Sequence, residues 1–421
     1  MLDIKLIRKN PEKVKEGIKK KGFDEKLVDE ILEIDKERRE KIKVVEDLRA
    51  KINKISKIIS KEKEKKEKYI KESKDISKKL EELEKELKEK EEKFNYLLSQ
   101  LPNLPFDNVP VGKDENDNVV IREVGKIPQF DFPIKDYLEI GENLDLIDVK
   151  RAAKVSGTRF GYLKNEMVLL ELALFRFALD TLMKEGFKPV LPPVMIKEQM
   201  AWGMGYLEQL DKEEAYYLEK DKLYLVGTSE QSIGPYFANE TLKEEDLPIR
   251  FVAISTCFRR EAGSYGKDTR GILRVHQFDK VEMFSFCHPE KSVEEHQFFL
   301  FLEEKLMQSL KIPYRVLEIC TGDLGRPAAA KYDIEAWFPT QNRYRETHST
   351  SNCTDFQARR LNIRYFDSKK KKLEFVHTIN GTAFSQRPLL AILENYQQKD
   401  GSVKIPEVLH QYLPFKVIKK S

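Results

Sequence analysis

The hydrophobic residues of this chain follow two different patterns, and the change falls near residue 102. Before it, apolar side chains recur at spacings of three and four in two runs: Leu27, Ile31, Ile34, Val45, Leu48, Ile52, Ile55 and Ile59, then Tyr69, Ile76, Leu80, Leu83, Leu87, Phe94, Leu97 and Leu101. Such spacing with charged flanks predicts a coiled coil. The charged stretch 61–68 separates the runs. We therefore predict that residues 1–101 form a long antiparallel helical hairpin, an arm of about 50–60 Å.

The second pattern mixes helices with strands. Residues 102–125 are rich in Pro, Asn and Asp and are predicted to be a linker. Beyond it, helices are predicted at 165–187, 292–310 and 387–397, and β-branched and aromatic strands at 188–196, 249–260, 281–287 and 314–320. Long helices between hairpin-connected strands predict an α+β domain over 126–421, built on an antiparallel β-sheet flanked by helices.

Charge refines the picture of the arm. The whole chain is nearly neutral, at +4, but residues 51–79 around the predicted turn hold 12 Lys and five acidic residues. Most Lys/Glu-rich runs are simply solvated helix surfaces. A basic tip on a long arm also suits a phosphate backbone, so nucleic acid remains a second interpretation.

Composition excludes several other classes. The 421 residues contain no run of about 18 apolar positions, so no membrane span is expected. The first residues lack the apolar core of a signal peptide. Four cysteines lie about thirty residues apart with no C-x-x-C pair, which favours free thiols in a reducing cytoplasm over a zinc site or a disulfide framework.

Candidate chemistry lies in five polar clusters beside the predicted strands. Phosphate-loop and dinucleotide-binding glycine motifs are absent. The clusters are GTSE (227–230), FRRE (258–261), HQFDKVEMF (276–284), YRETHSTSNCTDFQARR (344–360) and NGTAFSQRP (380–388). Each alone is weak, because an Arg–Glu pair is usually a structural salt bridge and Asn-Gly is usually a turn. Their occurrence together in this order is specific.

Together these clusters resemble the motifs of the class II seryl-tRNA synthetase family, over essentially the whole chain. GFKPVLPP (186–193) is similar to class II motif 1. Residues 258–284 are similar to motif 2, residues 380–397 to motif 3, and GTSE to the family's serine loop. The resemblance implies a serine–tRNA ligase that uses ATP and Mg²⁺, with the arm as its tRNA-binding domain.

The resemblance also implies roles for individual residues. Arg259 would hold the ATP α-phosphate and the serine carboxylate, Glu261 the adenine amino group, and Arg387 the γ-phosphate, while Phe278 would stack on adenine. The implied serine site comprises Thr228, Ser229, Glu230, Arg259, Glu282, Asn380 and Thr382; the implied ATP site also includes Arg260, Val275, Thr347 and His348; and the implied magnesium ligands are Glu346 and Ser349.

Physical chemistry agrees with those roles. The serine carboxylate is already ionised at pH 7, so its attack on the α-phosphate needs placement and charge neutralisation more than a general base. Guanidinium groups bind phosphate bidentately and keep their proton. Magnesium prefers oxygen ligands such as those of Glu346 and Ser349. Alanine would leave the polar groups of Glu282 and Thr382 unpaired, which disfavours it by roughly 10⁴–10⁵.

Some positions depart from the family pattern. Residues 347–350 read THST where relatives have small residues, so His348 is expected either to be a polar residue at the pocket rim or to perturb the metal site. Phe384 and Pro388 flank Arg387 and leave its rotamer open, and Thr382 replaces a serine while keeping a hydroxyl.

The resemblance implies tRNA-Ser as the partner, with tRNA-Sec as a further substrate where it exists. It also implies a homodimer formed through the helix 165–185, no membrane partner and a cytoplasmic location. Two other functions stay open: a synthetase-like ligase that loads a carrier protein, and a coiled-coil scaffold with a degenerate catalytic domain. The arm at 26–101 argues against the first, and the intact polar set argues against the second.

Overall fold

The structure is a computed structural model that describes residues 1–60, 66–207, 211–262, 266, 268 and 270–420. The chain divides into two compact units, Met1–Leu104 and Pro105–Ser421. Among the described residues, every helix is too short or too polar to cross a lipid bilayer.

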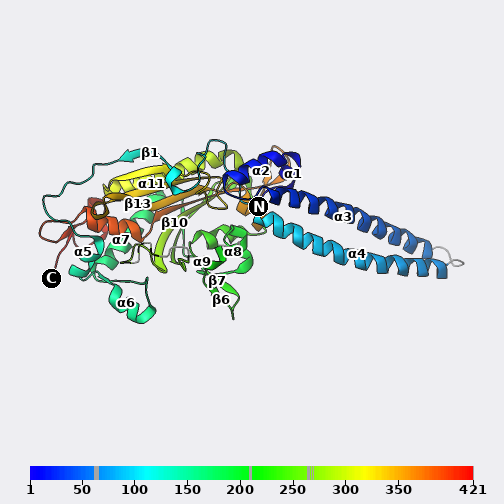
Figure 1. The fold of residues 1–421 in the computed structure, drawn as a ribbon, viewed down its shortest axis with the longest axis horizontal. Coiled ribbons are helices and arrows are strands. Elements are labelled where there is room, and N and C mark those ends of the chain that lie inside the picture. The colour runs from blue at the N-terminus through cyan, green and yellow to red at the C-terminus, as the bar shows by residue number, and fades with distance from the viewer. Residues whose placement is uncertain (61–65, 208–210, 263–265, 267, 269, 421) are drawn as a thin grey trace. The chain divides into compact units, whose positions relative to one another are not determined.

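The N-terminal unit is the predicted helical hairpin with two short helices added. Helices α1 (Ile4–Lys9) and α2 (Pro11–Lys20) precede the long helices α3 (Lys26–Ile59) and α4 (Lys66–Gln100), which lie side by side in Figure 1. The apolar core lies where all four helices meet, and it is formed by Leu2, Ile7, Val14, Ile18, Val28, Ile31, Ile34, Phe94, Leu97, Leu98 and Leu101. The three-and-four spacing thus predicts the seam correctly in the inner half of the hairpin.

Beyond this core, ion pairs join α3 to α4, and Val45 and Ile55 are buried further along α3. Glu37 pairs with Lys90, Lys41 with Glu86, and Arg49 with Glu84 at 2.6 Å, so numbering rises on α3 as it falls on α4. This order shows that the two helices are antiparallel. Exposed pairs of this kind each contribute about 0–1 kcal/mol, so several are needed to hold the helices together. The predicted turn 61–68 lies largely outside the described residues.

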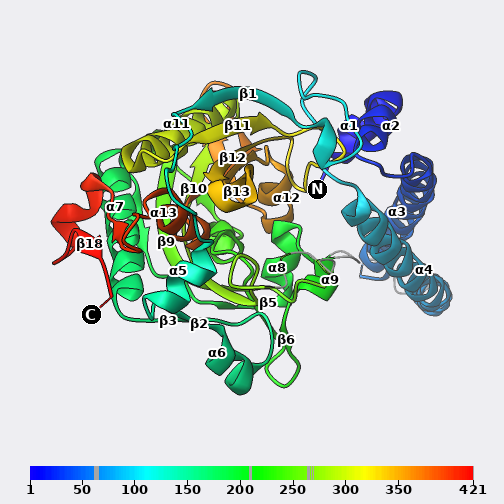
Figure 2. The same cartoon turned by 60° about the vertical axis from the view of Figure 1, so that its left-hand side comes forward.

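The C-terminal unit is built on one eight-stranded sheet (Figure 2). Its strands, in spatial order, are β1 (Val119–Val124), β11 (Tyr314–Glu318), β12 (Ala330–Phe338), β13 (Arg343–Asn352), β16 (His377–Phe384), β10 (Gln277–Cys287), β9 (Ile249–Phe258) and β4 (Lys188–Val190). All neighbours are antiparallel except β4 and β9. The predicted antiparallel sheet is confirmed, with one parallel edge.

Two segments differ from the sequence-based expectation. Strand β1 lies inside the segment 102–125 that was expected to be a linker, and it pairs with β11 at the sheet edge. The segment 188–196 contains two strands in different sheets, β4 and β5 (Met195–Lys197), and not one. The prolines at 192 and 193 lie between them, and proline donates no hydrogen bond to a ladder.

Three long helices cover one face of the sheet, whereas the other face is apolar at Phe284 and Phe286, which lie in a second core cluster, and polar at Glu282. Helices α7 (Glu166–Lys184), α11 (Ser292–Leu310) and α13 (Gln386–Asn395) share a core cluster with Val281, Met283 and Cys287 of β10. Because side chains alternate along a strand, Glu282 points to the opposite face, as do the residues paired with it. That opposite face carries the candidate site.

Candidate active site

Two adjoining cavities lie on the face of the sheet to which Glu282 points. The main cavity has a volume of about 620 Å³ and is lined by β9, β10, β12, β13 and β16 and by residues 205–206, 214–215, 227–228, 230–231, 323 and 325–328. The side cavity has a volume of about 100 Å³ and ends at α13. Six residues line both: Arg259, Glu261, Arg274, Lys280, Glu346 and Thr382. The two cavities therefore form one connected site.

Glu282 anchors one wall of the main cavity. Its Oε2 accepts hydrogen bonds from Thr228 Oγ1 at 2.5 Å and from the backbone N–H of Ser229 at 2.6 Å. Its Oε1 lies 2.5 Å from Lys280 Nζ. Burial disfavours the charged form, but Lys280 and these donors outweigh it and lower the pKa of Glu282. Glu282 is thus a fixed carboxylate that also holds the 228–229 turn in place.

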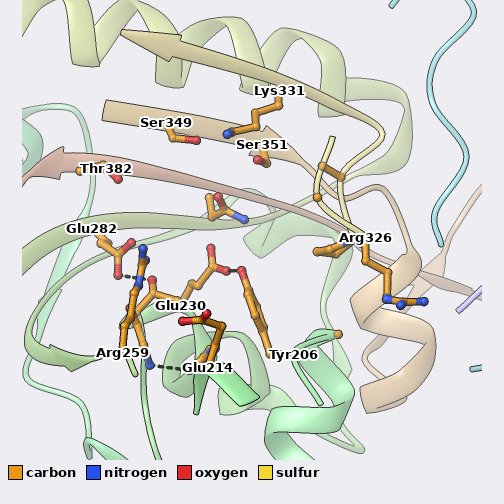
Figure 3. A pocket seen from close by; sticks show the side chains of 18 of the residues that line it. Tyr206, Glu214, Glu230, Arg259, Glu282, Arg326, Lys331, Ser349, Ser351 and Thr382 are labelled. Atoms are coloured by element: carbon orange, nitrogen blue, oxygen red, sulfur yellow. Dashed lines mark hydrogen bonds between the residues drawn. The ribbon is translucent and has the colours of Figure 1, made fainter. Parts of the chain in front are cut away.

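Glu230 is a second carboxyl group with a different environment. It begins helix α10 (Glu230–Ile233), is 5% exposed, and accepts a hydrogen bond from the hydroxyl of Tyr206. Burial and the charge of Glu282 raise the pKa of Glu230 to about 8. Figure 3 shows Glu230 beside Tyr206, between the positions of Arg259 and Arg326. A cation bound beside this carboxyl group would favour its ionised form.

Arg259 is positioned by backbone and aromatic contacts. Its Nε donates to the carbonyl oxygen of Gly227 at 3.0 Å, and its guanidinium carbon lies 5.3 Å from the ring centroid of Phe278. These contacts leave the terminal N–H groups of the fork for the cavity. A guanidinium held this way is prepared to bind a phosphate or a carboxylate.

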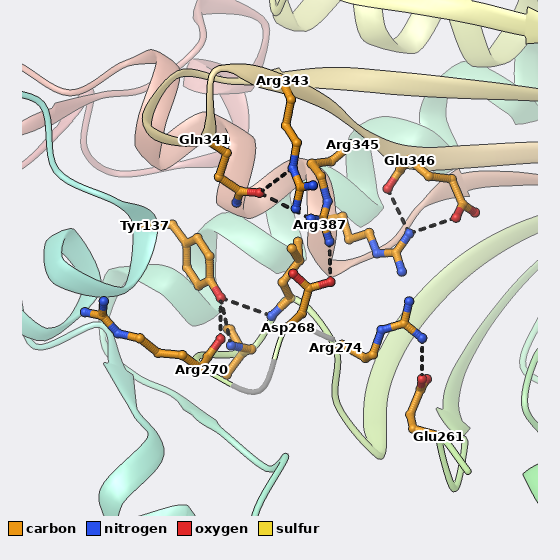
Figure 4. Close-up of polar contacts among 12 residues, drawn as sticks. Tyr137, Glu261, Asp268, Arg270, Arg274, Gln341, Arg343, Arg345, Glu346 and Arg387 are labelled. Atoms are coloured by element: carbon orange, nitrogen blue, oxygen red, sulfur yellow. Dashed lines mark hydrogen bonds and ion pairs between the residues drawn. The ribbon is translucent and has the colours of Figure 1, made fainter. Parts of the chain in front are cut away.

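Arg387 and Glu346 meet at the far end of the site. Arg387 Nη1 donates to the Glu346 backbone oxygen at 2.9 Å and to its carboxylate at 3.1 Å (Figure 4). Ser385 caps α13 by accepting from the Arg387 N–H, and this cap places Arg387 in the first helical turn. Although desolvation opposes it, Arg387 and Lys331 lower the pKa of Glu346 to about 2.

Glu261 faces the side cavity from the end of the β9 segment. Its carboxylate accepts from Arg274 Nη1 at 2.7 Å, as Figure 4 shows. Its backbone is left-handed, with a φ of 54°, a conformation that non-glycine residues adopt rarely and often at functional sites. Val275 and Phe278 complete the apolar wall nearby.

The strands β12, β13 and β16 form the remaining wall of the main cavity. They present Lys331, Ser349, Ser351, Asn380 and Thr382 (Figure 3). Lys331 Nζ lies 3.1 Å from the Asp333 carboxylate. Burial opposes its charge, but Asp333 and Glu346 raise the pKa of Lys331. A charged lysine therefore lies next to hydroxyl and carboxylate groups at this wall.

Most of the sequence-predicted residues converge on the two cavities. The main cavity is lined by Thr228, Glu230, Arg259, Glu261, Glu282, Glu346, Ser349, Asn380 and Thr382, and the side cavity adds Val275, Phe278, Thr347 and Arg387. Among the described residues, Ser229, Arg260 and His348 line neither. Ser229 lies behind the wall and bonds to Glu282, whereas Arg260 is exposed, with its guanidinium carbon 5.6 Å from the Tyr216 ring centroid.

The expectation that His348 lies at the pocket rim is wrong. The pairing of β12 and β13 shifts between Ile334 and Glu335, so that Thr347 has no partner and His348 pairs with Ile334. A bulge of this kind reverses the face of the residues that follow. His348 is 1% exposed, contacts Phe384 and is bonded to Thr347, and burial lowers its pKa to about 4.

Sequence reasoning missed several polar residues of the site, among them Tyr206, Arg274, Lys280, Lys331 and Ser351. The signal for Lys280 was available, because a residue two positions from Glu282 on a strand shares its face. Tyr206 and Lys331 reach the site only through pairings between distant segments, which no local pattern reveals.

The fold and the site define a class of enzyme. The sequence model of the tRNA synthetase class II core domain (G, H, P, S and T) matches residues 215–396, which include β9, β10, β13 and β16. A prolyl-tRNA synthetase from Giardia lamblia in complex with prolyl-adenylate shares this fold, with a TM-score of 0.58 at 18% identity over 65% of this chain and 54% of that one. The C-terminal unit is a class II aminoacyl-tRNA synthetase core.

Full-length relatives identify the family. The seryl-tRNA synthetase N-terminal domain model matches residues 1–105. Proteins named serine–tRNA ligase from Pyrococcus horikoshii and Dictyoglomus thermophilum are 48% and 49% identical, over 99% and 100% of this chain and 97% and 99% of their own lengths. The chain belongs to the seryl-tRNA synthetase family, and its activity is serine–tRNA ligation.

Solved structures agree with this assignment. The crystal structure of seryl-tRNA synthetase from Pyrococcus horikoshii complexed with ATP has a TM-score of 0.94 at 47% identity and covers 100% of both chains. The cytoplasmic serine–tRNA ligase of Naegleria fowleri in complex with AMP has a TM-score of 0.89 at 37% identity, covering 100% of this chain and 99% of that one. The predicted family, fold class and activity are confirmed.

Proposed function

We propose that the main cavity holds serine, that the side cavity holds the adenosine of ATP, and that the α-phosphate lies between them at Arg259. The observation that supports this division best is that Arg259, Lys280 and Glu346 line both cavities. Two anions brought together there meet two cations, Arg259 just after β9 and Lys280 on β10. Placement and charge neutralisation are the main requirements of this reaction.

Serine is recognised as a zwitterion with a hydroxyl group. Glu230, with Thr228 beside it, binds the ammonium group, and Arg259 binds the carboxylate. The hydroxyl group enters the wall formed by Glu282, Asn380 and Thr382, whose polar groups line the cavity. Alanine or glycine would leave these groups without a partner, which is the basis of selectivity against them.

ATP is held along the side cavity. Phe278 and Val275 pack against adenine, Glu261 accepts from its amino group, and Arg387 binds the γ-phosphate. Thr347 lines the same cavity. Arg260 and His348, which the family resemblance assigned to ATP, lie outside the cavity walls. Neither residue is proposed to contact the nucleotide.

The chemistry proceeds in two displacements. A serine carboxylate oxygen attacks the α-phosphorus, the new P–O bond forms, and the bond to the diphosphate breaks, so that seryl-adenylate and diphosphate result. The terminal ribose hydroxyl of the tRNA then attacks the seryl carbonyl carbon, AMP leaves with the electrons of the broken C–O bond, and the hydroxyl proton passes to the departing phosphate or to solvent. Arg259 stabilises the charge that develops on the phosphate oxygens in the first step.

Magnesium fits the residues at Glu346. Within the described ranges, no group of three or more His, Cys, Asp or Glu is placed to hold a metal by itself. Glu346 supplies an ionised carboxylate and Ser349 a hydroxyl group on the same cavity wall. Mg²⁺ commonly binds through one or two protein oxygens together with substrate phosphates. The ion would neutralise phosphate charge; the residues orient it.

The arm is proposed to bind tRNA. In this assignment, Met1–Leu104 form the tRNA-binding domain and Pro105–Ser421 the catalytic domain, because β1, inside the segment 102–125 expected to be a linker, belongs to the catalytic sheet. The basic segment 51–79 would contact the phosphate backbone of tRNA-Ser, and of tRNA-Sec where that tRNA occurs. Both partners follow from the family resemblance.

A homodimer is proposed on the basis of helix α7. One side of this helix packs against the core of the C-terminal unit. Its other side has apolar residues that are 38–57% exposed, namely Val168, Leu169, Leu172 and Met183. Leu191, just after β4, is 81% exposed. Exposed apolar side chains of this kind, gathered on one helix, suit a two-fold contact with a second copy of the chain.

A cytoplasmic location is proposed from the cysteines. Cys257, Cys287, Cys320 and Cys353 are all buried and outside any disulfide bond. Thiols of this kind suit a reducing compartment.

Serine-dependent exchange between ATP and pyrophosphate tests the proposal. Exchange is measured with each of the twenty amino acids, and charging of purified tRNA-Ser is measured next. Exchange with serine followed by charging is the expected result. Exchange without charging of any tRNA would favour a ligase that loads a carrier protein, and no exchange with any amino acid would favour a scaffold.

A further inference from the structure

The sheet opens beside the proposed serine pocket. Strands β13 and β16 pair at only three positions, where Thr350–Asn352 face Ile379–Gly381. Strand β16 continues beyond them and stays paired with β10 as far as Phe384. Thr382 is the first residue of β16 past the opening, and β13 provides no register partner for it. A buried backbone N–H at such a position needs another acceptor.

Glu303 supplies that acceptor from the helix beneath the sheet. It lies on α11, is 0% exposed, and its Oε1 accepts the backbone N–H of Thr382 at 3.0 Å. Gly381 makes this approach possible, because a Cβ atom there would lie 3.0 Å from the same oxygen and 3.1 Å from Phe299. The carboxyl group thus takes the place of a strand.

The environment of Glu303 favours a neutral carboxylic acid. Burial, followed by the charge of Asp333, raises its pKa well above the usual range. Its second oxygen, Oε2, has no hydrogen-bond partner among the described residues. A neutral amide of the same shape could therefore replace it, whereas a hydrocarbon side chain could not.

We propose that Glu303 is a positioning residue for serine specificity: by holding the Thr382 N–H where β13 leaves β16, it fixes the Thr382 hydroxyl group in the pocket wall. This inference rests on the proposed role of Thr382 in binding the serine hydroxyl. Glu303 itself contacts no substrate. Its effect is therefore expected on amino-acid recognition, and not on ATP binding.

The test uses three variants of the full chain in the exchange assay with serine, alanine and ATP as varied substrates. Glu303→Met removes the acceptor at similar size, and Glu303→Gln keeps it. Glu304→Met is the matched control, because Glu304 is the next residue of α11 but pairs with Arg122 and accepts from Tyr314. Thermal unfolding of each variant separates lost stability from lost recognition.

For Glu303→Met, we expect the KM for serine to rise by at most about a hundredfold, because the unpaired Thr382 N–H draws the pocket wall out of place and serine binding must restore it. The weak kcat/KM for alanine and the KM for ATP should stay near the parent values. Glu303→Gln should restore the serine KM to within about twofold. Glu304→Met should lower stability without changing the ratio of serine to alanine activity.

Equal loss with serine and alanine in Glu303→Met, or an unchanged serine KM, would overturn the proposal. If Glu303→Met does not fold, Gly381→Ala is measured in its place, because its methyl group would lie 3.0 Å from the Glu303 oxygen and force that contact to lengthen. An unchanged serine KM in that variant would also overturn it. If the proposed function itself is wrong, the parent protein will show no serine-dependent ATP–pyrophosphate exchange, which distinguishes that failure from failure of the proposal for Glu303.

Discussion

Replacing Arg259 tests the centre of the proposed reaction. In the structure this side chain is held by Gly227 at 3.0 Å and by the Phe278 ring at 5.3 Å, so its guanidinium is oriented before any substrate arrives. Alanine removes the charge and the fork together. Lysine keeps a positive charge but has no planar fork and cannot reproduce the Nε contact.

The magnitude follows from the loss of a preorganised donor at the α-phosphate. Removing one such donor typically costs roughly 2.7–4 kcal/mol of transition-state stabilisation, or about 10²–10³ in kcat. Arg259→Ala loses a bidentate group, so the upper end of this range is expected. Arg259→Lys should fall between the alanine variant and the parent, because compact charge replaces only part of the interaction.

Serine-dependent ATP–pyrophosphate exchange at saturating ATP and serine measures this step. Arg364→Ala is a suitable control, because Arg364 lies on β14 (Arg364–Asp367) in a different sheet and lines neither cavity. Parent-like exchange in Arg259→Ala would refute the assignment. Full activity in Arg259→Lys would show that charge alone suffices and that the fork geometry is irrelevant.

Three further predictions concern the arm, Glu230 and the oligomeric state. Replacing residues 41–86 by a short glycine loop keeps the Glu37–Lys90 pair and the inner core. The truncated protein should retain serine-dependent ATP–pyrophosphate exchange and lose tRNA charging. Loss of exchange in a folded truncated protein would contradict the assignment of the arm to tRNA binding. Raising the pH through about 8 ionises Glu230, so kcat/KM for serine should increase up to that pH. The increase should be absent in Glu230→Gln. A kcat/KM for serine that does not change with pH in the parent protein would contradict the role of Glu230. Light scattering after size exclusion should give twice the 49.4 kDa chain mass, and a monomer would reject the dimer.

Local patterns predict much of the fold. The apolar spacing from Leu27 to Leu101 identifies both long helices because side chains three and four apart share one helix face. The serine at 385, followed by Pro388, marks the start of α13, since capping and a fixed proline φ act within one turn. Such features depend on neighbours in the sequence and can be read there.

Non-local contacts account for what the sequence does not reveal. The bulge at Thr347 arises from pairing with β12 and turns His348 into the core. The strand β1 was mistaken for linker because its partner β11 lies almost two hundred residues further on. Glu303 reads as an ordinary polar position of a helix until the opening between β13 and β16 is known. In each case, the deciding partner comes from a distant segment.

The burial of all four cysteines has a practical consequence. No thiol lies on the outer surface, although Cys353 borders the main cavity, and burial raises the pKa of Cys257 to about 11, which keeps that sulfur protonated at neutral pH. A single cysteine introduced on an exposed face of the arm would therefore accept a fluorophore selectively without prior mutation of the others. Labelled protein prepared in this way could follow tRNA capture in real time.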